Sequence, residues 1–598
     1  MKAKEVEKSI AFYCEKGDEY MDTVHKVKTV TTADALMEAL QEVGISYVFC
    51  NLGSDHPSII EALAKAKEEQ KALPKAVICP HESVALAAAQ GYAMLSGEAQ
   101  GVIIHTDVGT QNLGGAVHNA FRARVPVFIF AGETPFTMAG ELPGSRNSYV
   151  NYLQNVYDQR GILRSYVKWE GDIRTGKNVK QLIYRAMQMA QSTPAGPVYL
   201  TGAREVLEEN VEVSPDYWDK WSLIEPTCIP QAGIEEIITD LLAAQHPVLI
   251  TSYLGRTKQA VLELIEFCER LAIPVVEQIP TYVNFPRNHL LHAGYDPNPF
   301  IAQADVIIAI DTDVPWVSTQ VEPQPSCKVY VMDVDPIKED IPLWHIPSMR
   351  NYRADAYETL QQLNTCLAQK ELDQEKIGQR FAQLAENHVA QRDAWAEEAA
   401  SKGGIITPEW LTKCLQNVVD DDTIILDETI TNTMTVCKHL PRTEIGTYFS
   451  SGGTSLGWNG GAAIGMKLAN PSKQVVSLTG DGTYLFSEPA AVHWMSRRYE
   501  APFLTVIYNN EGWNATKLNL LKRYPDGIAK KTDRYWVHFD QSADLAKIAE
   551  AAGGAYAQTV IDPHELPHAL QQAMDVVKSG KSAVVDVRLA PISNQKDY

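Results

Sequence analysis

The sequence lacks several patterns that define other classes of protein. Its nine cysteines form no CxxC pair and no regular spacing, which favours reduced thiols over a disulfide framework. No apolar run approaches the roughly eighteen residues of a membrane helix, and the first residues contain no apolar core of a signal peptide. Positive charge is not in excess either: the formal net charge is −21, so neither nucleic acid nor an anionic membrane is an expected partner. We therefore expect a soluble, cytoplasmic protein.

Three common site motifs are incomplete. Residues 81–82 (His-Glu) begin an HExxH pattern, but Ala85 stands where the second zinc-binding histidine would be. Residues 580–582 (Gly-Lys-Ser) resemble the end of a P-loop, but Asp575 takes the place of the first glycine. The middle of the chain has no GxGxxG after a strand. We therefore reject a zinc site of this type and predict neither a P-loop nor a dinucleotide fingerprint.

Alternating helical patterns and short apolar runs fill most of the chain from Thr31 onward, which is typical of α/β folds with parallel sheets. A chain of 598 residues is too long for one core and predicts three domains or so. The expected organisation is an N-terminal arm (1–29), a first α/β domain (30–206), a linker (207–229), a central Rossmann-like domain (230–365), an exposed connector helix (366–404) and a third α/β domain (405–598).

The most informative stretch runs from Val475 to Trp513. Two apolar runs flank a segment in which residues 487–489 (Ser-Glu-Pro) can start a helix, so the stretch is interpreted as a βαβ unit. Gly-Asp-Gly at 480–482 follows the first strand and Asn-Asn at 509–510 follows the second, and parallel strands place both groups at one crevice. Glycines allow close approach to a phosphate, and Asp and Asn oxygens are ligands that Mg²⁺ prefers. The stretch predicts a site for a metal-bound diphosphate.

The spacing of these groups resembles a known motif. GDG, then the 26 residues from Thr483 to Tyr508, then NN, resembles the diphosphate motif of thiamine diphosphate (ThDP) enzymes. That superfamily includes acetolactate synthase, benzoylformate decarboxylase and pyruvate decarboxylase. A lone GDG could be a strand-end turn, but the spacing, the flanking strands and NN together favour ThDP. The resemblance implies an α/β fold of three domains, in which pyrimidine-binding (PYR) and diphosphate-binding (PP) parallel-sheet domains flank the Rossmann-like domain.

The resemblance also implies ligands for the cofactor and its metal. Mg²⁺ would be held by Asp481, the Asn510 side chain and the Gly512 carbonyl, with diphosphate oxygens and water completing an octahedron. The diphosphate would be contacted by glycines and hydroxyl groups around the motif: Gly480, Gly482, Thr483 and Thr431.

The other end of the cofactor is assigned by two further segments. Glu82 resembles the glutamate that ThDP chemistry requires at the aminopyrimidine ring, where it shuttles a proton to the ring nitrogen. The alternative is a carboxylate that only favours the helix dipole. Residues 452–458 (GGTSLGW) resemble the segment that supports this ring, through Gly453 and Ser455. Leu456 matches the apolar residue that wedges under the thiazolium ring, although a leucine here could also be ordinary core.

Four residues are candidates for contact with the substrate. His105 and Ser54 occupy positions where benzoylformate decarboxylase carries an active-site histidine and a substrate-binding serine. An imidazole there could relay protons or hold a carboxylate, whereas the alternative is a hydrogen-bonded structural histidine. On the same analogy Gln111 and Gln154 line the pocket, although both could be plain surface residues.

The predicted reaction is ThDP- and Mg²⁺-dependent decarboxylation of a 2-oxo acid, pyruvate-like or aryl, with carboligation to a 2-hydroxy ketone, as in acetolactate synthase. Glu82, His105 and Leu456 are its expected catalytic residues. One alternative is a non-ligating decarboxylase of the benzoylformate decarboxylase type, which releases an aldehyde. Another is a catalytically silent protein with a regulatory or assembly role, which would have no chemical need for Glu82. Asn519 stands where acetolactate synthases place a tryptophan that selects the second 2-oxo acid, the acceptor. The sequence therefore does not identify the acceptor of this protein.

Two expectations concern the rest of the assembly. FAD, which acetolactate synthases proper carry, is not expected here, because residues 311–316 (DTDVPW) replace the arginine- and aspartate-rich segment of that family. Glu82 and Asp481 lie in different domains, so the site would be assembled between domains. By family analogy it lies between the subunits of a homodimer or homotetramer. The expected partners are a small-molecule 2-oxo acid or aldehyde, with no nucleic acid and no membrane.

Overall fold

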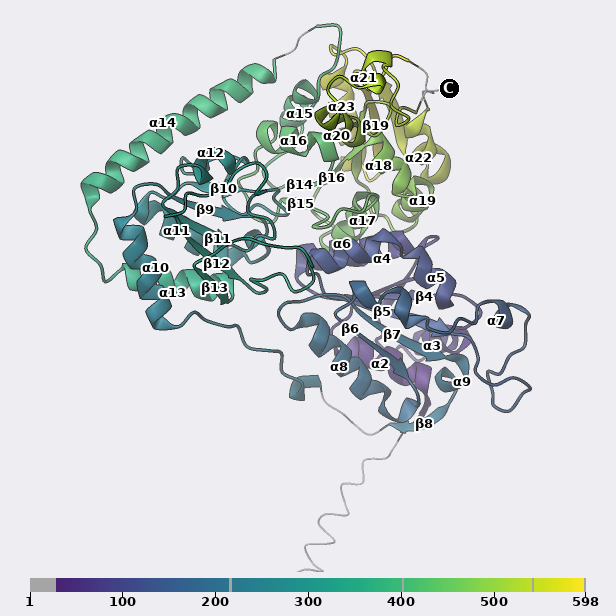
Figure 1. Ribbon diagram of the computed structural model, residues 1–598. Coiled ribbons are helices and arrows are strands. Elements are labelled where there is room, and N and C mark those ends of the chain that lie inside the picture. Colours follow the sequence, from purple (N-terminus) through teal and green to yellow (C-terminus); the bar gives the residue numbers. More distant parts are fainter. Residues whose placement is uncertain (1–27, 214–217, 401–402, 540–542, 596–598) are drawn as a thin grey trace, which may run out of the picture.

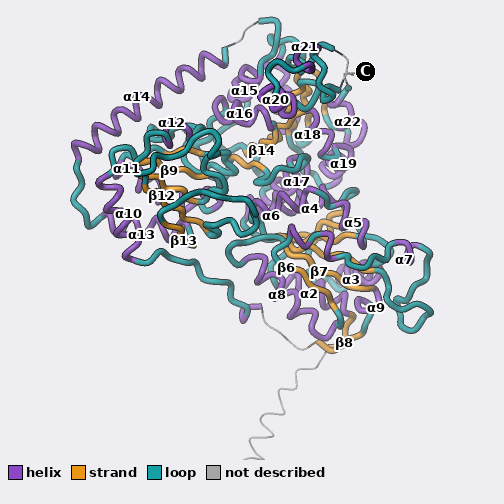
Figure 2. Tube along the Cα trace, viewed as in Figure 1, coloured by secondary structure: helices purple, strands orange, loops and turns teal. Residues whose placement is uncertain are grey.

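Three parallel-sheet units make up the part of the chain described by the computed structural model, which covers residues 28–213, 218–400, 403–539 and 543–595 (Figure 1). Helices and strands alternate in each unit, which confirms the predicted α/β fold class (Figure 2). Of the expected N-terminal arm, residues 1–27 lie outside the described residues. Within the described ranges, no helix combines the length and apolar character needed to cross a membrane.

The N-terminal domain is built on a parallel sheet with the strand order β3-β2-β4-β5-β7-β6. Its strands are β2 (Tyr47–Cys50), β3 (Lys75–Ile78), β4 (Gln100–Ile104), β5 (Val127–Glu133), β6 (Trp169–Ile173) and β7 (Val198–Ala203). Its helices are α2 (Thr32–Glu42), α3 (Pro57–Glu68), α4 (Glu82–Ser96), α5 (Thr106–Asn112), α6 (Gly115–Arg122), α7 (Val150–Leu153), α8 (Val179–Gln191) and α9 (Arg204–Leu207). The central strand β4 is buried along its whole length, as expected for a sheet covered on both faces.

The segment expected as a linker, residues 207–229, begins with a strand. β8 (Asn210–Val213) pairs antiparallel with β1 (Lys28–Thr31), so both ends of the domain are joined in a two-stranded ribbon. Val30 and Val211 are buried in this pair. Val and Glu alternate over β8, which is the pattern of a strand with one buried face. This segment was expected to be a linker because it is rich in acidic residues.

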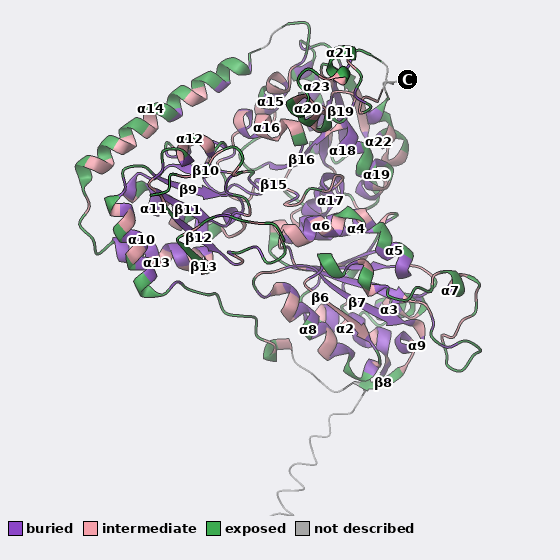
Figure 3. Cartoon of the chain, viewed as in Figure 1, coloured by how far each residue is buried: buried purple, intermediate pink, exposed green. Residues whose placement is uncertain are grey.

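The central domain has a parallel sheet with the order β10-β9-β11-β12-β13. Its strands are β9 (Pro247–Thr251), β10 (Val275–Glu277), β11 (Val306–Ile310), β12 (Lys328–Asp333) and β13 (Arg350–Arg353), and its helices are α10 (Gln231–Ala243), α11 (Lys258–Leu271), α12 (Asn298–Ile301) and α13 (Ala356–Leu367). Next comes α14 (Gln374–Glu398), which runs along the outside of the molecule with most of its surface exposed (Figure 3). Lys376 and Arg380 attach this helix by donating to carbonyl groups at the carboxyl ends of α10 and α11.

The C-terminal domain repeats the plan of the first, with the parallel strand order β15-β14-β16-β17-β19-β18. Its strands are β14 (Ile424–Glu428), β15 (Tyr448–Ser450), β16 (Val475–Gly480), β17 (Leu504–Asn509), β18 (Tyr556–Val560) and β19 (Ala583–Arg588). Its helices are α15 (Pro408–Gln416), α16 (Thr433–His439), α17 (Asn459–Ala469), α18 (Asp481–Phe486), α19 (Pro489–Arg498), α20 (Asn514–Arg523), α21 (Ile528–Thr532), α22 (Leu545–Gly553) and α23 (Leu566–Lys578).

One helix start differs from the sequence expectation. Residues 487–489 were expected to begin the helix of the βαβ unit, and α19 does begin at Pro489. A short helix, α18, precedes it and begins at Asp481, inside the GDG motif. Glycine-rich sequence disfavours a helix by propensity, but Gly482 and Thr483 are buried here, and tertiary packing outweighs that preference.

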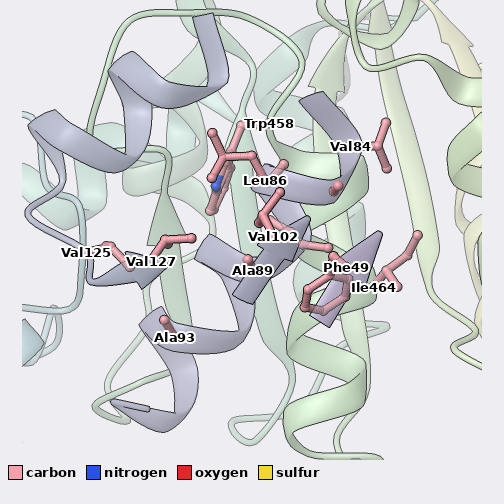
Figure 4. Close-up of a cluster of buried hydrophobic side chains, with 14 of the residues drawn as sticks. Phe49, Val84, Leu86, Ala89, Ala93, Val102, Val125, Val127, Trp458 and Ile464 are labelled. Carbon is pink, nitrogen blue, oxygen red and sulfur yellow. The ribbon is translucent and has the colours of Figure 1, made fainter. Parts of the chain in front are cut away.

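The first and third domains meet where α4 packs against α17. Figure 4 shows the cluster of buried side chains at this contact, with Leu86 and Ala89 from α4 and Trp458 and Ile464 from the C-terminal domain. The helix backbones approach so closely that a Cβ built on Gly465 would lie 1.9 Å from the Ala88 carbonyl oxygen. Small residues are therefore required along this contact.

We predict that Gly465→Ala destabilises the protein by about 1–3 kcal/mol, because its methyl group overpacks the contact. The matched control is Gly378→Ala in α14, where an added Cβ meets nothing within 4 Å. This control removes a flexible residue from an exposed helix and should stabilise by about 0.5–1 kcal/mol. Calorimetric transition temperatures measure both effects. Shifts of the same sign would contradict the proposed packing.

Candidate active site

A pocket of about 360 Å³ lies at the carboxyl ends of β14, β16 and β17. Its lining comes from the C-terminal domain, between residues 429 and 516. The structure brings together here most of the cofactor and metal residues predicted from sequence: Thr431, Leu456, Gly480, Asp481, Gly482, Thr483, Asn510 and Gly512. Parallel strands ending at one edge explain why residues so far apart in sequence meet.

Asp481 begins α18 and is buried at the floor of this pocket. Its Oδ1 accepts a hydrogen bond from its neighbour, the Gly482 N–H, at 2.8 Å, and its Oδ2 accepts one from the Gly512 N–H at 2.9 Å. Burial raises the pKa of the Asp481 carboxyl to about 6, although these N–H groups oppose the shift. A cation beside the carboxylate would offset the cost of burying its charge.

Asn510 supplies an oxygen with no partner. Its side-chain Oδ1 is buried, and none of the described residues donates a hydrogen bond to it. The Gly512 carbonyl accepts from the Asn514 N–H at 3.2 Å, which leaves its second lone pair free. A carboxylate, an amide oxygen and a carbonyl oxygen form the hard donor set that Mg²⁺ takes, so these residues fit the predicted metal.

Residues 589–592 hold the loop that carries Asn510 in place. This contact was not predicted from the sequence. The Ile592 N–H donates to the Asn510 carbonyl at 2.9 Å, and the Leu589 N–H donates to the Asn509 carbonyl at 2.8 Å. Lys517 on α20 donates to the Ile592 carbonyl. No local signal could have shown this, since the contacts join segments that are far apart in the chain.

Glu82 is located in the N-terminal domain, at the first position of α4. Its side chain is buried, and its Oε2 accepts a hydrogen bond from the Asn112 amide at 2.5 Å. His81 caps the helix by accepting from the Ser83 N–H at 3.3 Å. The described lining of the diphosphate pocket is all C-terminal, so Glu82 is not among the residues that line it.

The predicted pyrimidine-supporting loop lies between these two parts. The Ser455 N–H donates to Asn119 Oδ1 at 3.0 Å, and the Asn119 amide donates back to the Ser455 carbonyl at 2.9 Å. Gly453 also lies against Asn119, so this side of the loop faces α6. Thr454 and Leu456 line the pocket, and Thr454 also contacts α6, with its Oγ1 3.0 Å from His118 Nε2. The loop thus connects the N-terminal domain to the pocket wall.

The predicted substrate residues divide into two groups. His105 and Gln154 are in contact, with His105 Nε2 2.9 Å from the Gln154 amide nitrogen. Ser54 and Gln111 are exposed, and Gln111 makes a long hydrogen bond to Asp107 at 3.4 Å. His105 also contacts Asp55 through Nδ1, a partner that sequence reasoning did not assign.

Comparison with known families agrees with this geometry. Residues 30–162 match the N-terminal TPP-binding domain of thiamine pyrophosphate enzymes, residues 234–363 match their central domain, and residues 430–587 match their C-terminal TPP-binding domain. The chain therefore belongs to the thiamine pyrophosphate (ThDP) enzyme family. The resemblance predicted from the GDG and NN motifs is confirmed.

The relatives span several reactions. The chain is 23% identical to the acetolactate synthase large subunit of Haemophilus influenzae, over 94% of this chain and 95% of that protein. It is 24% identical to the sulfoacetaldehyde acetyltransferase of Rhodobacter capsulatus, over 93% and 94%. A solved thiamine diphosphate-dependent 4-hydroxybenzoylformate decarboxylase from Rhodococcus jostii aligns with a TM-score of 0.76 at 20% identity, covering 95% of this chain and 100% of that chain. Family membership therefore identifies the cofactor domains and leaves the substrate open.

The two neighbouring asparagines allow a direct test of the metal site. We predict that Asn510→Ala leaves the thermal transition of the cofactor-free protein within about 1 °C, because Oδ1 has no hydrogen bond to lose. Its Mg²⁺ affinity should fall about tenfold or more, since a ligand to a cation is removed. Calorimetric titration of Mg²⁺ in the presence of ThDP measures this loss.

Asn509→Ala is the matched control. The Asn509 amide donates to Asp586 Oδ1 at 2.8 Å, and its oxygen accepts from the Glu511 N–H at 3.1 Å. Its loss should destabilise the cofactor-free protein by about 1–3 kcal/mol. An unchanged Mg²⁺ titration in Asn510→Ala would remove this side chain from the metal site.

Proposed function

We propose that the protein is a ThDP- and Mg²⁺-dependent enzyme that decarboxylates a 2-oxo acid and joins the remaining acyl unit to a second carbonyl compound. The observation that carries the proposal is the unpartnered Asn510 oxygen in the same pocket as the buried Asp481 carboxylate. Two hard oxygen donors at the carboxyl ends of parallel strands form a site for a metal-bound diphosphate. Membership of the ThDP enzyme family supplies the matching cofactor.

Each pocket residue then has a role suited to its chemistry. Asp481, Asn510 and the Gly512 carbonyl hold Mg²⁺, while Gly480, Gly482, Thr483 and Thr431 contact the diphosphate. Gly453 and Ser455 support the aminopyrimidine ring, and Leu456 presents an apolar side chain beneath the thiazolium ring. When bound, ThDP supplies a carbon nucleophile and an electron sink. Glu82 exchanges a proton with the pyrimidine nitrogen, and its bond from Asn112 keeps the carboxylate in place.

The complete site is proposed to form between two subunits. One chain offers a diphosphate pocket lined by C-terminal residues and, separately, Glu82 on its N-terminal domain. Large apolar side chains are exposed in both domains: Met138, Tyr149, Leu153 and Tyr157 in the N-terminal domain, and Trp513, Ile528 and Trp536 in the C-terminal domain. Such a concentration of apolar surface is typical of an interface. A homodimer, or a homotetramer made of two such dimers, would cover the exposed apolar side chains of both domains.

The central domain is proposed to bind no FAD. At the carboxyl ends of its strands, where a nucleotide would lie, charged side chains pair with one another. Arg256 pairs with Asp311 at 3.1 Å, and Lys338 pairs with Asp333 at 2.7 Å and with Asp313 at 3.1 Å. Arg256 and Lys338 are thus already paired with carboxylates at this edge of the sheet. Flavin absorbance in the purified protein would contradict this proposal.

Product analysis tests the reaction itself. With ThDP and Mg²⁺ we expect turnover of pyruvate or benzoylformate, with release of CO₂ and formation of a 2-hydroxy ketone. A second candidate, simple decarboxylation to an aldehyde, is favoured by the imidazole of His105, since a proton donor near the reacting carbon competes with a carbonyl acceptor. Chromatography of the products separates the two. Absence of ThDP-dependent turnover over a broad panel of 2-oxo acids would refute both.

Mixing of inactive subunits tests the shared site. We predict that Glu82→Gln and Asp481→Asn homodimers are each nearly inactive, because every site carries one lesion. Co-expression should restore about 25% of wild-type activity, since half of the randomly formed dimers contain one intact site. The control pairs Glu82→Gln with the double variant Glu82→Gln/Asp481→Asn, in which no intact site can form. Recovery no greater than in this control would locate both residues in a site within one chain.

A further inference from the structure

We propose that Asp55 is a positioning residue for His105: its buried carboxylate holds the imidazole through Nδ1 and so presents Nε2, beside Gln154, as the atom that takes up and releases a proton. This inference rests on the proposed function and adds a residue that the sequence motifs and the family match do not assign. It gives the substrate side of the site an oriented Asp–His pair instead of a lone histidine.

Asp55 is almost fully buried in the turn before α3 and has its hydrogen bonds satisfied by the elements around it. Its Oδ1 lies 2.5 Å from His105 Nδ1, and its Oδ2 accepts from the Thr106 N–H at 3.2 Å. The Thr106 N–H belongs to the first residue of α5, directly after His105. The carboxylate therefore binds both the imidazole ring and the start of α5. Rotation of the imidazole would break the first bond and so remove a hydrogen bond from a buried charge, which is costly.

Two glycines make room for this pair. A Cβ built on Gly53 would lie 2.2 Å from His105 Nδ1, and one on Gly132 would lie 1.8 Å from Asp55 Oδ2. The ring therefore packs directly on the backbone of the turn before α3, and the carboxylate packs on the end of β5. The position of the pair is defined by contacts on both sides as well as by its own hydrogen bond.

A second histidine lies beside the carboxylate and shares it. His56 is fully buried, and its Nδ1 lies 3.1 Å from the Gly53 nitrogen and 2.9 Å from Asp55 Oδ1. His105 makes the shorter contact with the carboxylate, 2.5 Å from Oδ1. It is also the exposed member of the group, with 17% of its side chain accessible against 0% for His56.

The surrounding charges favour a proton on His105. Burial on its own would lower the pKa of His105, but the hydrogen bond to Asp55 and the charges of Asp55 and Asp107 outweigh it, so the pKa is raised. Burial would likewise raise the pKa of Asp55, yet the two imidazoles beside it hold that pKa below its usual range. With Nδ1 occupied, the second proton binds at Nε2. The Gln154 amide nitrogen lies 2.9 Å from this atom, so the amide must turn to offer its Oε1, which is buried without a partner among the described residues, to the protonated ring.

A metal ion is a poor alternative for this cluster. Asp55, His56 and His105 each offer a ligand atom within 4.8 Å of the others. However, the 2.5 Å between Asp55 Oδ1 and His105 Nδ1 is a hydrogen-bond distance. An ion that binds each atom at about 2.0–2.2 Å with tetrahedral geometry requires a wider separation. The geometry is that of a carboxylate–imidazole pair.

A double-mutant cycle tests whether Asp55 acts through His105. With the 2-oxo acid that the product analysis identifies, Asp55→Asn should lower kcat about tenfold to a hundredfold and change KM less. In a His105→Gln background the same substitution should change kcat by less than about twofold, because the ring that it positions is gone. An equal loss in both backgrounds would mean that Asp55 is structural and would overturn the proposal.

Two further variants complete the kinetic test. Asp107→Asn removes the other carboxylate near the ring without touching its Nδ1 and should lower kcat less than about threefold. Gly53→Ala alters no polar group but displaces the ring, and it should lower kcat as Asp55→Asn does. If Asp55→Asn fails to fold, Gly53→Ala decides the matter, and an unchanged kcat in that variant refutes the proposal.

Chemical modification provides a measurement that is independent of turnover. Diethyl pyrocarbonate reacts with neutral imidazole, so mass spectrometry of His105 peptides from ThDP-free protein reports the ring's protonation. At about pH 6 the modification of His105 should be several-fold faster in Asp55→Asn than in wild type, while His246 serves as the internal reference. An unchanged rate of His105 modification in Asp55→Asn would overturn the proposed Asp55–His105 pair. If instead no 2-oxo acid is turned over but the rate rises, the proposed function fails and the Asp55–His105 pair stands.

Discussion

The close contact between α4 and α17 is the constraint on which the site depends. Glu82 opens the first of these helices, and the loop that carries Ser455 and Leu456 leads directly into the second. Because the helix backbones touch at Gly465, neither helix can shift along the other without a clash. One apolar contact between domains therefore determines the position of Glu82, the proposed proton-exchanging carboxylate, relative to the wall of the cofactor pocket in the same chain, which in the proposed dimer belongs to the other site.

Much of this arrangement could be predicted from sequence because the signals are local. The fold class followed from short apolar runs between helical patterns, and the sheets are parallel as expected. The pocket followed from one rule, that ligands gather beyond the carboxyl ends of parallel strands, applied to the motifs around Asp481 and Asn510. These residues meet because each directly follows its own strand, and such placement can be read without knowledge of distant contacts.

The rest depends on contacts between distant segments. β8 pairs with β1 at the opposite end of its domain, and α18 begins inside a glycine-rich motif because the surrounding protein buries it. Asp55 stood in the sequence beside the predicted Ser54, yet its role depends on a histidine in another element and on Gly132 at the end of β5. Propensity and spacing carry no information about such pairs, which arise from tertiary packing.

The hydrogen bond from Ile592 to Asn510 has a consequence for the order in which the protein matures. A ribosome completes the N-terminal and central domains, and most of the third, before residues 589–592 leave the exit tunnel. Until then the backbone of the loop that holds Asn510 lacks the two hydrogen bonds from Leu589 and Ile592. β19 directly precedes these residues and pairs with β17 and β18, so the sheet of the third domain and the loop that holds Asn510 are completed at the same stage. The proposed metal site can therefore form only once the third domain is complete, so the cofactor is acquired after, and not during, synthesis of that domain.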